Sequence, residues 1–295
     1  MRDQEILAGL GEIAEDSGTF GLTVYGNVGE NMQPVLSYTE TGQVQGALAW
    51  LTGGFTGTEG PQGPEPAGIE IAQLWDDNGA LGLNIYGDVD GTLQPVFTSG
   101  DMGQGSAALA WLTGNFTGTG NDFTEIAQLW DDNGTLGLII YGSPGGNPQA
   151  VFAQPDMGQG SGALAFLTGY FTGAGTTTQI AQPWDNNGTL EMIVYGNVGD
   201  GNLGTVYAAP MNQPSDALAF MTGNFIGSGY TQIAQARNNN GALQLLVYGD
   251  IGNGGLSTVF SNDISQVTFA LAWVTGDFTG TGNTQILQPS LAVLG

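Results

Sequence analysis

Short apolar segments recur along the whole chain, and polar or glycine-rich segments separate them. In one clear copy the apolar segments cover residues 108–116, 125–130, 135–142 and 149–154. Segments this short that are rich in β-branched and aromatic residues are typical of strands. They do not alternate cleanly between polar and apolar positions, which is typical of strands buried on both faces of a sheet. The pattern therefore predicts four strands in each copy.

The polar segments between these strands carry turn signals. The sequence Asp-Asp-Asn-Gly at residues 131–134 separates the second and third strands. Asn-Gly between two apolar runs favours a tight hairpin, because both central residues of its turn must tolerate a positive φ. A Thr-Gly-Thr-Gly loop at residues 117–120 joins the first two strands, and a linker at residues 155–162 leads to the next copy.

The same unit is repeated five times. Tyr-Gly pairs recur at spacings of 61, 55, 54 and 53 residues, and Thr-Gly pairs recur at the same spacings. The tyrosines are Tyr25, Tyr86, Tyr141, Tyr195 and Tyr248, and the threonines are Thr52, Thr113, Thr168, Thr222 and Thr275. The first spacing is longer because of a Pro/Gly-rich insertion at residues 58–68. Repeats of about 55 residues with four strands each are typical of propeller blades.

We therefore predict an all-β fold, a single five-bladed β-propeller domain of four-stranded antiparallel blades that spans residues 1–295. The chain begins near Leu10 in the second strand of a repeat and returns to a first strand at residues 271–278. This phase predicts that the C-terminal strand closes the ring. Residues 285–295 are a further copy of the second strand, so one terminus must lie elsewhere.

Charge narrows the range of partners. The chain has 27 acidic residues and two basic ones, Arg2 and Arg237, and its formal net charge is −25. Binding to nucleic acid or to an anionic membrane surface requires clusters of Lys or Arg, so we expect neither. No apolar run is long enough to span a bilayer, so we expect no membrane insertion. The N-terminus lacks the apolar region of a signal peptide, so localisation is left open, although we suspect secretion.

The missing residue types limit catalysis. The chain has no Cys, no His and no Lys. It therefore cannot use a thiol nucleophile, a Ser-His pair or a Schiff base. Only a pair of carboxylates, as in glycosidases, remains. We expect a protein that is not an enzyme.

The segment TGDFTGTGNTQIL at residues 275–287 resembles the FG-GAP/VCBS repeat family, and the similarity recurs in each repeat. The resemblance implies a propeller. It also implies calcium sites, because members of this family often bind calcium through loop carboxylates at alternate positions. Those positions are here Asn115, Thr117 and Thr119 in one copy and Asp277, Thr279 and Thr281 in the last. Threonine hydroxyls are poor calcium ligands, so we expect metal-free loops held by Thr hydroxyl-to-backbone bonds, and no cofactor. Residues 88–91 (Asp-Val-Asp-Gly) are a weaker calcium candidate.

The candidate ligand site combines tryptophans with polar turns. Trp75, Trp130 and Trp184 each precede a turn of acids and amides. An indole can stack on the C–H face of a sugar, while Asp and Asn hydrogen-bond its hydroxyls. The turn residues are Asp76, Asp77 and Asn78, then Asp131, Asp132 and Asn133, then Asp185 and Asn186, and we expect Gln104 and Gln159 of the linkers on the same rim. The alternative is that these residues serve only the turns and that each Trp caps the core.

Other repeated residues predict structure. We expect the first-strand aromatics to pack between blades, and the buried glutamines to hydrogen-bond across blades. The aromatics are Trp50, Trp111, Phe166, Phe220 and Trp273, and the glutamines are Gln73, Gln128, Gln182 and Gln235.

Three functions remain open. The first is a lectin with repeated sites between blades, in which several weak sites give avidity for glycans or a cell-surface glycoprotein. The alternative is a protein-binding adhesion or toxin-associated module. A glycosidase is the third and weakest, because it needs a unique carboxylate set, whereas the Asp residues here follow the repeat.

Overall fold

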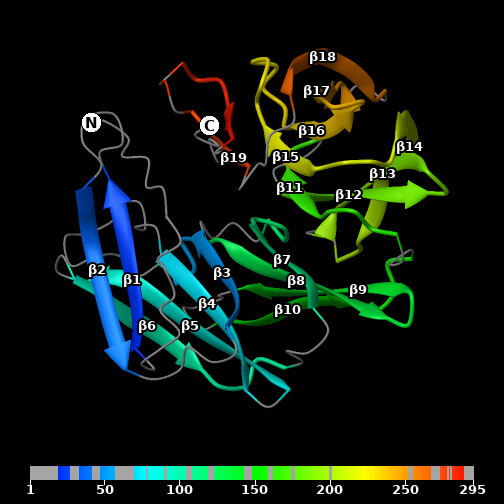
Figure 1. Ribbon diagram of the computed structural model, residues 1–295. Helices are drawn as coiled ribbons and strands as arrows, with labels where there is room; N and C mark the ends of the chain where they lie inside the picture. Colours follow the sequence, from blue (N-terminus) through cyan, green and yellow to red (C-terminus); the bar gives the residue numbers. More distant parts are fainter. Residues whose placement is uncertain are drawn as a thin grey trace. The chain divides into compact units, whose positions relative to one another are not determined.

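The computed structural model of this 295-residue chain is built from twenty β-strands in its described part (Figure 1). The structure describes residues 19–26, 33–41, 47–56, 70–77, 79–89, 92–103, 108–118, 123–142, 148–158, 162–173, 177–198, 201–251, 255–266, 273–277, 279 and 281–288. Within these residues we find no helix with the length and hydrophobicity that crossing a membrane requires.

Four sheets are antiparallel meanders of four strands in chain order, as the pattern predicted. The first contains β3 (Ala47–Gly53), β4 (Glu70–Asp77), β5 (Ala80–Val89) and β6 (Thr92–Ser99). The second contains β7 (Ala108–Gly114), β8 (Glu125–Asp132), β9 (Thr135–Gly142) and β10 (Gln149–Gln154). The third contains β11 (Leu167–Gly169), β12 (Gln179–Asn186), β13 (Thr189–Gly196) and β14 (Gly204–Pro214). The fourth contains β15 (Ala219–Gly223), β16 (Gln232–Asn239), β17 (Ala242–Gly249) and β18 (Ser257–Gln266).

The prediction of five four-stranded blades was wrong in its count. The described residues form four such sheets and two two-stranded ones, β1 (Thr19–Gly26) with β2 (Gln33–Thr41), and β19 (Val274–Gly276) with β20 (Gln285–Leu287). The four complete sheets each arise from contiguous sequence, in which every strand pairs with its neighbour through a local connection. The strands of the fifth repeat come from opposite ends of the chain, so no hairpin joins its two halves.

The Asn-Gly turns have the predicted backbone conformation. Asn133, Asn187 and Asn240 have φ angles of 54°, 53° and 53°. The glycines that follow them have φ angles of 91°, 88° and 92°. Two successive positive φ angles define the hairpin turn that matches the twist of the flanking strands, so the hairpin prediction is confirmed at these three turns.

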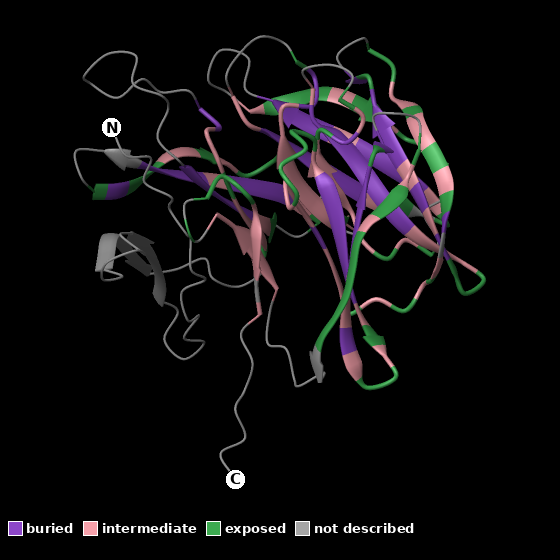
Figure 2. Cartoon of the chain, turned by 90° about the horizontal axis from the view of Figure 1, so that it is seen from above, coloured by how far each residue is buried: buried purple, intermediate pink, exposed green. Residues whose placement is uncertain are grey.

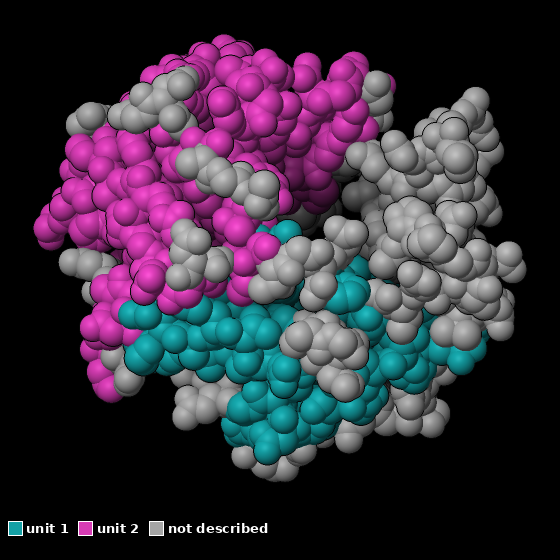
Figure 3. Space-filling view, turned by 180° about the vertical axis from the view of Figure 1, so that it is seen from behind, with its two compact units in different colours: residues 1–115, 120–131, 137–155 teal, residues 116–119, 132–136, 156–295 magenta. Residues whose placement is uncertain are grey.

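The chain divides into two compact units (Figure 3). Unit 1 comprises residues 1–115, 120–131 and 137–155, and unit 2 comprises residues 116–119, 132–136 and 156–295. In unit 1 the first strands β3 and β7 lie side by side. Trp111 of β7 packs against a buried cluster that includes Leu81, Leu83 and Ile85 of β5. The first strand of one sheet therefore covers the apolar face of the sheet before it.

Unit 2 repeats this packing. The first strand β15 lies between the first strands β11 and β19 and contacts both. Phe220 of β15 packs on the cluster that contains Met192 and Val194 of β13, and Trp273 packs on the cluster of β16 and β17. The predicted packing of first-strand aromatics between sheets is thus confirmed for Trp111, Phe220 and Trp273. Buried residues run along the strands of the sheets (Figure 2), and on β13 they include Leu190, Met192 and Val194. Successive sheets stacked face to face in this way are the local arrangement of propeller blades.

Candidate functional site

Two of the predicted tryptophans lie flat against the neighbouring strand. Trp75 of β4 is half-buried and pairs in register with Gly82 of β5. A Cβ atom at Gly82 would lie 2.1 Å from Cε2 of Trp75, and a Cβ atom at Gly137 would lie 2.3 Å from Cε2 of Trp130. Each indole therefore packs on a strand that has no side chain at that point. Each ring serves packing, as the structural alternative expected, although each residue as a whole is only half-buried. The indole nitrogen of Trp75 is itself buried and has no hydrogen-bond partner among the described residues.

The third and fourth sheets carry a different arrangement at the same place. Trp184 faces Glu191 across the strand pair. Arg237 replaces the tryptophan in the fourth sheet, where its Nε donates a hydrogen bond of 2.7 Å to Oε1 of Gln244 and its Nη1 lies 3.9 Å from Oδ1 of Asp216. The tryptophan sites are therefore limited to the first three complete sheets.

The acid after each tryptophan helps to hold its turn. Oδ1 of Asp76 accepts a 2.6 Å hydrogen bond from the backbone N–H of Gly79, and Oδ1 of Asp185 accepts one of 2.6 Å from Gly188. Asn238, in the sheet without the tryptophan, makes the same bond to Gly241 at 2.7 Å. Such bonds from an Asp or Asn side chain to the backbone stabilise a turn whether or not a ligand binds. Asp76 is nevertheless exposed, and so is Asp131 at the same position of the second complete sheet.

The remaining predicted turn residues divide into two groups. Asn133 is exposed, while Nδ2 of Asn186 donates a 2.7 Å hydrogen bond to Oε1 of Glu191 and is thus engaged within its own hairpin. Asn78 and the side chains of Asp77 and Asp132 lie outside the described residues.

The linkers reach the turn end of the hairpins, as predicted. The backbone N–H of Met102 donates to the carbonyl of Leu81 at 2.8 Å, and the N–H of Leu81 donates to the carbonyl of Gly103 at 2.9 Å. Met157 and Gly158 bind Leu136 in the same way, at 2.7 and 3.0 Å. Each linker is therefore fixed two strand residues beyond the Asn-Gly turn. Gln104 and Gln159 each follow directly on these segments but lie outside the described residues.

A Glu or Gln at the start of the second strand organises the loop after the first strand. In the first sheet, Oε2 of Glu70 accepts from the backbone N–H groups of Phe55 and Thr56 at 2.5 and 2.8 Å, and Oε1 accepts from the hydroxyl of Thr56. In the third sheet, Oε1 of Gln179 accepts from the N–H groups of Phe171 and Thr172, and its Nε2 donates to Oγ1 of Thr172 at 2.6 Å. The predicted role of Thr hydroxyls was incomplete. The missed signal was the Glu or Gln that recurs before Ile in every second strand.

The loop closest to the calcium pattern is filled by an amide. Nε2 of Gln285 lies within hydrogen-bond distance of four oxygens. They are Oδ1 of Asp277 at 3.3 Å, Oγ1 of Thr279 at 2.7 Å, Oγ1 of Thr281 at 2.9 Å and the carbonyl of Asn283 at 3.1 Å. The oxygens of Asp277, Thr279 and Thr281 therefore surround the amide nitrogen of Gln285. Only Asp277 among them is a carboxylate, so these residues do not fit calcium. No group of three or more acidic residues suited to a metal ion occurs among the described residues, and part of the 88–91 candidate lies outside them.

The repeated tyrosines and glutamines bind one another. The hydroxyls of the tyrosines of the four complete sheets donate to Oε1 of the buried glutamine in the same sheet, at 3.0, 3.1, 3.0 and 2.6 Å. The pairs are Tyr86 with Gln73, Tyr141 with Gln128, Tyr195 with Gln182, and Tyr248 with Gln235. Each of these four bonds lies within one sheet. Gln235 also makes a bond across sheets, since its Nε2 lies 3.5 Å from the carbonyl of Pro214.

Burial changes the acidity of these tyrosines. It raises the pKa of Tyr141 and of Tyr195 to about 12. Burial also raises the pKa of Tyr248, against the opposing influence of the Arg237 charge. Phenols held neutral in this way act as hydrogen-bond donors and stabilise the sheet.

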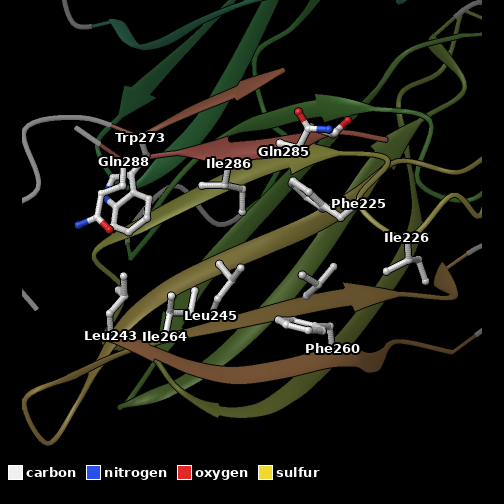
Figure 4. A pocket seen from close by; sticks show the side chains of 12 residues that line it. Phe225, Ile226, Leu243, Leu245, Phe260, Ile264, Trp273, Gln285, Ile286 and Gln288 are labelled. Atoms are coloured by element: carbon white, nitrogen blue, oxygen red, sulfur yellow. The ribbon is translucent and has the colours of Figure 1, made fainter. Parts of the chain in front are cut away.

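An apolar groove of about 460 Å³ in unit 2 was not predicted (Figure 4). Leu245, Phe260, Ile264, Trp273 and Ile286 are among its apolar lining residues, and Thr284, Gln285 and Gln288 are its polar members. Ile264 is 53% exposed, whereas Met211, at the matching place in β14, is 6% exposed. No described lining residue is charged, so the groove lacks the converging polar groups of a catalytic site.

No family model and no curated protein matches the sequence. Among solved structures the chain is similar to two rhamnogalacturonan lyases. It matches rhamnogalacturonan lyase YesW at a TM-score of 0.46 and 14% identity, covering 93% of this chain and 55% of the other. It matches the Bacillus licheniformis rhamnogalacturonan lyase PL11 at a TM-score of 0.41 and 13% identity, covering 91% and 63%. The chain thus spans less than two thirds of each lyase, and similarities this distant give no information on its activity.

Proposed function

We propose that this protein is a non-enzymatic, multivalent glycan-binding protein with repeated sites at the turn ends of its hairpins. One observation carries the proposal. A half-buried indole, a carboxylate turn and an inter-repeat linker lie at the same end of the hairpin in the first complete sheet, around Trp75. The tryptophan on its glycine and the exposed acid after it recur at Trp130 and Asp131. Trp184 with Asp185 is a third tryptophan-acid pair, but its linker contact is of another kind: the N–H of Asp185 donates a 2.8 Å hydrogen bond to the carbonyl of Gly162, in the linker that precedes this sheet.

The chemistry of this end suits a sugar. An indole in a half-buried residue at this end offers a ring that would stack on a pyranose. Asp76 uses one oxygen for the turn bond to Gly79, and a carboxylate has about four acceptor positions in all. Capacity therefore remains to accept hydrogen bonds from sugar hydroxyls. Each site has few contacts, so binding to a surface that carries many glycans would depend on avidity.

Binding is favoured over catalysis for two reasons. The chain has no His, Cys or Lys, and hydrolysis by carboxylates needs two acids in a defined pair. The repeated acids Asp76 and Asp185 are instead each occupied in a turn.

The decisive experiment replaces the acid after each tryptophan by alanine and compares the result with the same change in a turn that has no tryptophan. We expect the triple variant Asp76→Ala, Asp131→Ala, Asp185→Ala to lose more than tenfold of its binding to glycan-coated surfaces. Asn238→Ala breaks the equivalent turn bond to Gly241 where no tryptophan is present, so it controls for a loosened turn. If the folded triple variant binds every glycan surface as the parent does, the proposal fails, and the protein-binding adhesion module becomes the better hypothesis.

A further inference from the structure

Three large side chains are exposed on two loops of unit 2. Tyr170, in the loop between β11 and β12, is 45% exposed. Ile226 and Tyr230, in the loop between β15 and β16, are 51% and 42% exposed. These loops connect first to second strands, so within each sheet they lie at the end opposite the Asn-Gly turn.

The two tyrosines depart from the repeat. The positions equivalent to Tyr170 are Gly54, Asn115, Asn224 and Asp277, and the described positions equivalent to Tyr230 are Phe123, Thr177 and Asn283. A small or polar residue is therefore enough for the loop fold at most of these positions. Large rings that the fold does not require, and that remain exposed, indicate a binding role.

Both loops are held together, so the rings are pre-positioned. The N–H of Tyr170 donates to Oγ1 of Thr231 at 2.9 Å, and the N–H of Thr231 donates to the carbonyl of Tyr170 at 3.2 Å. A Cβ atom at Gly173 would lie 2.1 Å from Cε1 of Tyr230, so this ring rests on the neighbouring loop. Rigid aromatic side chains lose little conformational entropy on binding a ligand.

The exposed area on these two loops is too small for a stable protein interface and fits a small ligand. A stable protein interface needs about 800 Å² and 20 to 30 residues on each side. Two side chains fall far short of that, but two phenol rings suit one or two sugar rings. None of the described residues of these two loops is charged, and the chain as a whole carries −25. Such a molecule repels acidic sugars at low ionic strength.

We infer that Tyr170 and Tyr230 form a second carbohydrate-binding surface, here named the tyrosine surface, which takes neutral rather than acidic sugars. Ile226 lies outside it, because its side chain lines the apolar groove. This inference rests on the proposed glycan-binding function and adds a site on different residues. At the tyrosine surface the phenol rings stack on the sugar. At the tryptophan sites, carboxylates beside the indole also accept hydrogen bonds from sugar hydroxyls.

The experiment measures surface plasmon resonance on immobilised galactan, mannan and a β-glucan, with polygalacturonate as the acidic counterpart. We expect the double variant Tyr170→Ala, Tyr230→Ala to bind the neutral polysaccharide about tenfold more weakly than the parent. Tyr170→Phe with Tyr230→Phe keeps the rings and should stay within about threefold. Leu218→Ala, at another exposed apolar site of unit 2, should bind as the parent does. Circular dichroism checks the fold of each variant.

The outcomes separate the two proposals. If the alanine double variant binds like the parent while the triple Asp variant loses binding, the tyrosine surface is wrong and the proposed function stands. If the parent binds none of the neutral polysaccharides, the tyrosine surface is wrong, and if it does not bind polygalacturonate either, the proposed function fails as well. If polygalacturonate binds at low salt more tightly than the neutral chains, the selectivity for neutral sugars is wrong.

Discussion

A buried tyrosine hydroxyl donates to a buried glutamine in each of the four complete sheets, and the two residues are always 13 positions apart. The tyrosine was visible in the sequence as half of a Tyr-Gly pair, and the glutamine as a polar residue within an apolar strand. Their pairing was not visible, because the sequence does not show which way two side chains turn within a sheet.

Replacing one of these tyrosines tests the bond. We expect Tyr195→Phe to lower the free energy of unfolding by about 1 to 2 kcal/mol, because the fully buried Gln182 loses a hydrogen bond. Urea denaturation measures the change. Tyr170→Phe, at an exposed site, should stay within about 0.5 kcal/mol. Equal effects in both variants would argue against the buried pair.

The raised tyrosine pKa values predict a loss of stability at high pH. Tyr141 and Tyr195 have pKa values of about 12 when folded, against 10.0 as the ordinary value. Between these values the unfolded chain loses the phenolic proton more readily, so unfolding is favoured. Their contribution is thus complete below about pH 10 and is lost as the pH rises to about 12. The rise of tyrosinate absorbance for these residues should coincide with unfolding by circular dichroism, and early titration in a folded protein would contradict the prediction.

At the scale of elements, hairpins and loops are shaped by contacts that repeat from sheet to sheet. The Asn-Gly turns, the linkers and the Glu or Gln of each loop all make their contacts with the same strand or with a neighbouring strand. Substitutions at a glycine and at a glutamine test these contacts.

The glycine beneath each indole is required by close packing. We expect Gly82→Ala to cost about 1 to 3 kcal/mol, because its Cβ atom would overlap the ring of Trp75 and displace it. Thermal unfolding measures the loss, and tryptophan fluorescence reports the displaced ring. Gly204→Ala is the control, since no atom lies within 4 Å of its Cβ position. A neutral Gly82→Ala would show that the indole does not rest on this strand.

The loop after each first strand is expected to depend on its Glu or Gln and not on a metal. Gln179→Ala removes three hydrogen bonds and should cost about 2 to 3 kcal/mol. Gln179→Glu should be much milder, because Glu70 accepts the equivalent bonds in the first sheet. EDTA should leave the melting temperature of the parent unchanged. A drop of more than a few degrees on chelation would mean that these loops hold a metal ion.

At the scale of the whole molecule, charge dominates behaviour in solution. The chain carries 27 acidic and two basic residues, and the one basic residue in the described part, Arg237, lies beside Asp216. Self-repulsion keeps such molecules apart at neutral pH.

Solubility should be lowest near the sequence pI of about 4.1, where protonation of carboxylates removes this repulsion. Turbidity measured from pH 3 to pH 8 at fixed protein concentration tests the prediction. Circular dichroism at each pH separates precipitation of folded protein from acid unfolding. Constant solubility across that range would show that the net charge does not control association.

The sequence by itself determined the strands, the turns and the repeat. Residues 108–116, 125–130, 135–142 and 149–154 became β7 to β10 with only small changes of boundary. These features depend on local backbone preferences and on hairpins between neighbouring strands, both of which a linear pattern records.

Only the tertiary structure decided what each side chain meets. It placed Trp75 on Gly82, gave the Thr-Gly loops their Glu and Gln partners, and left Tyr170, Tyr230 and Ile264 exposed. It also reduced five predicted four-stranded sheets to four in the described part of the chain. A linear pattern does not record which side chains meet across adjacent strands, even within one hairpin, or which of them stay exposed. A repeat divided between the chain ends also has no local hairpin to join its halves.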